Sequence, residues 1–77
     1  MRSGTELRPL GATPYGVAYD GANVWVVNFG GSSITKLARN TGAVLGTYSV
    51  GSGPEEVAFD GAYLWIVNVN DGTVSKL

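Results

Sequence analysis

Hydrophobic residues fill two short runs of the chain, "NVWVVN" at 23–28 and "YLWIVN" at 63–68. A strand with one face in water alternates apolar and polar side chains, so unbroken runs predict strands buried on both faces. A shorter stretch precedes each run, at 15–19 and 55–59, and ends in Asp-Gly, a strong hairpin signal. We therefore expect two hairpins, each with its second strand in the interior.

Further strands are predicted after each hairpin. A turn rich in Gly, Asn and Ser separates the first run from "SITKL" at 33–37, and the second copy continues into "TVSKL" at 73–77. After "ARNTG", "AVLGTYSV" at 43–50 is more polar and suits an outer strand. No segment has helical spacing over three turns. The chain is therefore predicted to be all-β, with a four-stranded antiparallel meander as its unit.

The sequence repeats itself after forty positions without a gap. Most differences between the copies are conservative, such as Tyr19 against Phe59. The residues that recur unchanged forty positions later are Gly11, Pro14, Val17, Ala18, Asp20, Gly21, Ala22, Trp25, Val27, Asn28, Lys36 and Leu37. A period near forty residues is typical of supersecondary units that bury their faces against neighbouring copies.

Burial on both faces favours the β-propeller, in which the sheet of each blade lies between two others. Such packing explains why Trp25 and Val26 are both apolar although they point to opposite faces. The competing class is the β-sandwich, where each sheet has one face in water and the alternation should be cleaner. We expect one whole blade at 11–50 and three strands of a second blade at 51–77.

The repeated motif also supports this fold by resemblance. The phrase P-x-x-V-A-[YF]-D-G-A-x-[VL]-W-[VI]-V-N, followed by [ST]-[IV]-[TS]-K-L, resembles the blades of bacterial NHL/YVTN-type propellers, including virginiamycin B lyase-like ones. The resemblance covers 11–50 and 51–77, and it implies the fold more than an activity, because unrelated functions occur on such rings. The lyase-like enzymes use a histidine and a bound metal, and this chain has no histidine. The resemblance therefore implies the blade without the catalysis.

The strands do not add up to two whole blades. The stretch 5–10, with Leu7 and Leu10, aligns with the end of 43–50 and is predicted to be an outer strand, while the second blade lacks one. We expect 1–77 to be a single unit whose stretch 5–10 completes a blade of a neighbouring chain. Two blades cannot close a ring, so head-to-tail homo-oligomerisation is predicted. A six-bladed homotrimer is slightly favoured over an eight-bladed homotetramer, because fewer subunits lose less association entropy.

Composition and charge limit the partners. Five Lys and Arg against six Asp and Glu give a net charge of −1, which offers no basic surface for nucleic acid. No apolar run is long enough for a membrane and the first residues lack a signal-peptide core, so we expect a soluble chain whose compartment is not indicated. Without Cys or His, the chain lacks thiolate metal ligands and the commonest general base. No catalytic residue, metal or cofactor is predicted.

The loops after the second and fourth strands are expected on one face of the ring, and they differ between the copies. One blade offers aromatic residues there and the next offers oxygen-bearing ones, namely Tyr15, Phe29, Glu55, Glu56, Asn70 and Asp71. These residues are candidates for binding a sugar, a peptide or a hard cation. The alternative is ordinary solvated loop charge.

Two pairs in the repeated motif are assigned to the core and the assembly. Trp25 and Trp65 are expected to pack between blades, with ligand stacking as the alternative. Asn28 and Asn68 are expected to bond the backbone of a neighbouring loop, the alternative being a ring of carboxamides at the channel mouth.

The function favoured by these observations is that of a structural module that assembles into a symmetric ring without catalysis. A binding module for a sugar, peptide or protein on the loop face is the alternative. A lyase or lactonase is the least favoured hypothesis.

Overall fold

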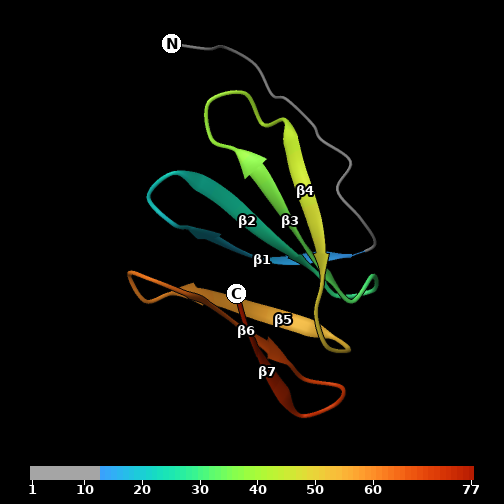
Figure 1. Cartoon of the computed structure of the whole chain (residues 1–77). Helices are drawn as coiled ribbons and strands as arrows, with labels where there is room; N and C mark the ends of the chain where they lie inside the picture. Colours follow the sequence, from blue (N-terminus) through green and yellow to red (C-terminus); the bar gives the residue numbers. More distant parts are fainter. Residues whose placement is uncertain (1–12) are drawn as a thin grey trace.

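The described residues, 13–77, form two antiparallel sheets and no helix (Figure 1). The first sheet of the computed structural model has the order β1-β2-β3-β4 and the second has the order β5-β6-β7. The strands are β1 (Pro14–Tyr19), β2 (Asn23–Asn28), β3 (Ser33–Ala38), β4 (Val44–Ser49), β5 (Pro54–Phe59), β6 (Leu64–Asn68) and β7 (Thr73–Lys76). The predicted all-β class is confirmed.

The expected outer strand at 5–10, with Leu7 and Leu10, lies outside the described residues. Over 13–77 the structure contains no helix that is long and apolar enough to cross a membrane.

The hairpin turn of each sheet is built in the same way. Asp20 and Asp60 each use one carboxylate oxygen to accept hydrogen bonds from the backbone N–H groups two and three residues later. The next residue has a positive φ, 93° at Gly21 and 101° at Gly61. A side chain would be strained at these angles, which explains why both copies have Asp-Gly here.

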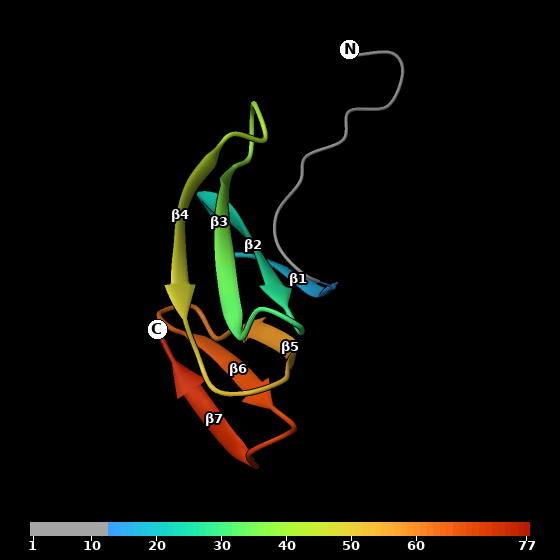
Figure 2. The same cartoon turned by 90° about the vertical axis from the view of Figure 1, so that its right-hand side faces the viewer.

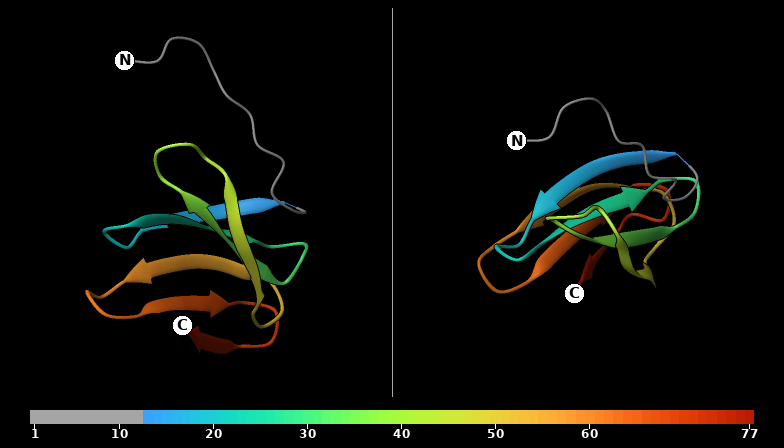
Figure 3. Two further views of the ribbon diagram at one scale, coloured as in Figure 1. Left: turned by 45° about the horizontal axis from the view of Figure 1, so that its top comes forward. Right: turned by 90° about the horizontal axis from the view of Figure 1, so that it is seen from above.

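The two sheets pack against each other, with β1 beside β5 (Figures 1 and 3). The front face of the four-stranded sheet carries Trp25, Val27 and Ile34, and the back face of the three-stranded sheet carries Leu64 and Ile66. These five side chains are buried and form the hydrophobic core. Figure 2 shows how the connection from β4 returns the chain to β5, so that the second sheet follows the first without a crossover.

No sheet formed by residues 13–77 covers the other two faces. The front face of the three-stranded sheet carries Trp65 and Val67 on β6 and Val74 on β7, and all three are exposed. The back face of the four-stranded sheet carries Val24 and Val26, which are half-buried.

The single chain buries only one face of β6. Its side chains alternate between buried and exposed along the whole strand. Trp65 therefore lies on the exposed front face, while its counterpart Trp25 is buried. The reason is that the second sheet covers Trp25, whereas residues 13–77 form no third sheet that could cover Trp65. The predicted packing of Trp65 between blades needs a further sheet and stays a prediction.

Candidate functional site

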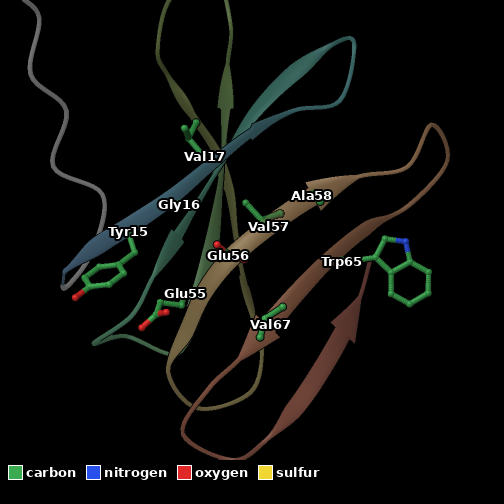
Figure 4. A pocket seen from close by; sticks show the side chains of 9 residues that line it. All are labelled: Tyr15, Gly16, Val17, Glu55, Glu56, Val57, Ala58, Trp65 and Val67. Atoms are coloured by element: carbon green, nitrogen blue, oxygen red, sulfur yellow. The ribbon is translucent and has the colours of Figure 1, made fainter.

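A groove of about 450 Å³ runs between β1, β5 and β6 (Figure 4). Figure 4 shows Tyr15 and Glu55 at one end of the groove and Trp65 at the other. The lining residues are Tyr15, Gly16, Val17, Glu55, Glu56, Val57, Ala58, Trp65 and Val67. Two carboxylates, a phenol ring and several apolar side chains thus share one surface, which suits a ligand with cationic or hydroxyl groups beside an apolar part.

Tyr15 is held at the rim by Phe29. The two rings are stacked with centroids 5.3 Å apart and an interplanar angle of 28°. Pairing of Pro14 with Asn28 and a hydrogen bond from the Phe29 N–H to the Thr13 carbonyl bring the start of β1 against the turn after β2. The aromatic pair predicted for one loop face is therefore assembled, with Tyr15 strongly exposed.

Asn70 and Asp71 lie apart from the groove, in the turn between β6 and β7. The Asp71 carboxylate accepts hydrogen bonds from the Thr73 hydroxyl and the Ser52 N–H, and the Thr73 bond lowers the pKa of Asp71 most. The Asn70 N–H donates to the Ser52 carbonyl at 3.2 Å. These residues bind the turn to the loop before β5. The structure therefore divides the six predicted ligand residues, and over 13–77 it contains no group of three Asp or Glu arranged to hold a metal ion.

Each tryptophan of the motif is hydrogen-bonded to the aspartate of its own hairpin. The indole N–H of Trp25 donates to Asp20 at 2.8 Å, and that of Trp65 donates to Asp60 at 2.7 Å. Sequence reasoning assigned the aspartates to the turns alone and missed this second role. The signal was the spacing of five residues between Asp and Trp in both copies.

These hydrogen bonds stabilise the charged form of both carboxylates. The Trp65 indole has the largest effect on Asp60, followed by the N–H groups of Tyr63 and Ala62, and together they lower its pKa from 3.8 to about 2. The pKa of Asp20 is lowered too, first by the backbone N–H three residues later and then by the indole. A group whose pKa is depressed by folding stabilises the folded state above its unfolded pKa and loses that effect as the pH falls.

Asp60→Asn is expected to make the protein less stable than the wild type at pH 7, with the difference shrinking as the pH falls from about 4 to 2. The amide still accepts the turn bonds, but it has no charge to lose. The melting temperatures of both proteins, measured at pH 7, 4, 3 and 2, test this expectation. A difference that stays constant with pH would contradict it, because every other carboxylate titrates equally in the two proteins.

Asn28 and Asn68 are completely buried at the ends of β2 and β6. The Asn28 amide donates to the hydroxyls of Ser33 and Thr35 on β3, and the Asn68 amide donates to the corresponding hydroxyls on β7. Their carboxamides thus join two strands of one sheet through side chains, and not through the backbone of a neighbouring loop as predicted. The Oδ1 atom of each has no hydrogen-bond partner within the described chain.

The arrangement of strands is also found in a much larger protein. The chain is similar to Kuenenia stuttgartiensis hydrazine synthase, with 28% sequence identity and a TM-score of 0.77 over 100% of its length. It spans 23% of the length of that hydrazine synthase chain. No family model and no curated protein matches the chain. The resemblance to NHL/YVTN repeats therefore stays a prediction.

Proposed function

We propose that the chain is a self-assembling β-propeller module, in which each sheet is a blade and copies join head to tail into a closed ring. The observation that carries this proposal is the exposed front face of the three-stranded sheet. Trp65, Val67 and Val74 are the counterparts, forty positions on, of the three residues that the four-stranded sheet buries against its neighbour. The three-stranded sheet therefore exposes a face whose counterpart on the four-stranded sheet is covered within the chain. We infer that another copy of the chain covers it.

The exposed fractions measure the difference between the two faces. Trp25, Val27 and Ile34 are 8%, 0% and 0% exposed, whereas Trp65, Val67 and Val74 are 39%, 41% and 59% exposed. A contiguous apolar face of this kind is typical of an interaction surface. Covering it would remove the largest exposed apolar side chains of β6 from water, which is favourable.

A lysine lies beside the tryptophan on both front faces. The Lys36 ammonium lies 5.5 Å from the Trp25 ring, and the Lys76 ammonium lies 5.5 Å from the Trp65 ring. The first pair occurs in a face that another sheet covers, so the second does not prevent covering. The matching surface on a second copy is the back face of its four-stranded sheet, with Val24 and Val26 in the places of Leu64 and Ile66.

Joining a front face to a back face is a heterologous contact, which produces either a closed ring or an open filament. With two blades in each chain, a ring has an even number of blades, six in a trimer or eight in a tetramer. One edge of β7 can accept an additional strand. Among the described strands β7 pairs with β6 alone, while its counterpart β3 pairs on both sides. Residues 5–10 of the adjoining copy are the proposed source of the additional strand.

The proposal contains no catalytic step. The sequence has no histidine or cysteine, and the ionisable carboxyl groups of the groove are those of Glu55 and Glu56. From hydrazine synthase the proposal takes only the arrangement of strands, since the chain spans 23% of that protein.

The groove favours a second function, binding of a ligand with cationic or hydroxyl groups. Tyr15, Glu55 and Glu56 would provide its polar contacts. Trp65 and Val67 line the groove and also belong to the exposed front face. A ligand that fills the whole groove would therefore compete with the second copy.

The solution mass tests the assembly. Light scattering coupled to size-exclusion chromatography, run over a range of loading concentrations, should show one species of three or four times the 8.0 kDa chain. A chain that remains at 8.0 kDa at every concentration would contradict the proposal.

A further inference from the structure

Gly16 on β1 lies in close contact with the second sheet. A Cβ atom at this position would lie 2.9 Å from the Glu55 carbonyl oxygen, 3.2 Å from the Val27 Cγ2 and 3.5 Å from the Glu56 Cα. The first distance is shorter than real Cβ contacts, and its partner is backbone, which cannot move aside by changing a rotamer. The two inner strands therefore pack this closely because position 16 has no side chain.

The second copy of the motif has a side chain at that position. Glu56 follows Pro54 by two residues, as Gly16 follows Pro14, and both strands have an irregular register at this point. Glu56 is exposed and lines the groove. The front face of the three-stranded sheet thus differs from its counterpart by a Cβ and a carboxylate at a position where the internal contact has room for neither.

This difference bears on the contact between copies, and the inference rests on the proposed assembly. If the external contact reproduced the internal one, the Glu56 Cβ would be about as close to the Tyr15 carbonyl oxygen of the next copy as a Cβ on Gly16 would be to the Glu55 carbonyl oxygen. Overpacking of this kind is unfavourable where nothing can move, so the inner strands of two copies must lie farther apart than β1 and β5 do.

We propose that Glu56 distinguishes the two contacts: it makes the contact between copies looser than the contact within the chain. The front face with Gly16, on the four-stranded sheet, packs against the other sheet of its own chain. The front face with Glu56, on the three-stranded sheet, packs against another copy. The assembly separates at the Glu56 junctions first, into intact two-sheet subunits.

The test compares Glu56→Gly, Glu56→Ala and Glu55→Gly with the wild type in sedimentation measurements over a wide concentration range. Glu56→Gly is expected to lower the dissociation constant about tenfold, because it removes the Cβ and makes the two contacts alike. Glu56→Ala removes the charge but keeps the Cβ, so its dissociation constant should stay within about twofold of the wild type. Glu55→Gly is the control for a neighbouring glycine and a lost charge, and it should not tighten the assembly.

The outcomes separate the two proposals. Equal tightening by alanine and glycine at position 56 would overturn the inference, since charge alone would then explain the effect. An assembling wild type with an unchanged or weaker Glu56→Gly variant would overturn it as well, provided that circular dichroism shows the variant folded, because glycine weakens a strand. If the wild type and all variants remain monomers at every concentration, the proposed assembly itself fails.

Discussion

Val67→Glu is expected to give a folded monomer that no longer assembles. Val67 lies on the front face of the three-stranded sheet and is 41% exposed in the single chain, so a carboxylate there remains in water while the chain is alone. Its counterpart Val27 is fully buried where a second sheet covers it. A charge in that environment without a partner costs several kcal/mol, enough to abolish association. Light scattering should show only the 8.0 kDa species, with an unchanged circular dichroism spectrum.

The matched control is Val69→Glu, which makes the same substitution at an exposed valine in the turn beyond β6 and should leave the assembly intact.

Mixing Val67→Glu with a second blocked variant, Val26→Glu, gives a sharper test of the head-to-tail arrangement. Val26→Glu blocks the back face of the four-stranded sheet, and each of the two blocked chains retains the face that the other lacks. The mixture should form a species of two chains and nothing larger. Larger species in either blocked variant alone would show that another surface makes the contact.

Ile66→Ala is expected to destabilise the chain by about 2–5 kcal/mol, because it leaves a cavity in a small core. Ile66 is fully buried and contributes to a core of five side chains. The loss is a large share of the roughly 5–15 kcal/mol that stabilises a folded domain, so the melting temperature should fall by at least about 10 °C. The measurement belongs in the Val67→Glu background, since association would make the melting temperature depend on concentration.

Val74→Ala in the same background is the comparison. Val74 is 59% exposed, so its truncation should change the free energy of unfolding by less than about 0.5 kcal/mol. Similar losses for the two variants would mean that the two sheets do not pack through Ile66 in solution.

The strands could be predicted from the sequence because their signals are local. The stretches 15–19 and 55–59 correspond to β1 and β5 within one residue at the start, and the run at 23–28 coincides with β2. Asp-Gly turns and apolar runs determine these boundaries by themselves. The burial of individual residues was harder to predict, since Trp25 and Trp65 have nearly the same neighbours in sequence. Only the presence of a sheet on one of them makes the difference.

The candidate site was predictable only in part, for the same reason. The differences between the loops selected Tyr15, Glu55 and Glu56, which line one groove. They also selected Asn70 and Asp71, which instead form hydrogen bonds with Ser52 in the loop before β5. Those bonds join residues about twenty positions apart and leave no short-range signal. The role of glycine at position 16 was equally hidden, since it depends on the backbone of another sheet.

The unequal exposure of the two tryptophans also allows intrinsic fluorescence to report on association. Both indoles donate to an aspartate and lie against a lysine, but Trp25 also contacts the Tyr48 ring and is shielded from water. Emission from an indole shifts to shorter wavelength when water is removed from it. Under the proposed assembly, Trp25 would supply a constant signal from the interior, while emission from Trp65 would shift when a neighbouring chain covers it. Self-association can therefore be followed without a label, in solutions too dilute for scattering.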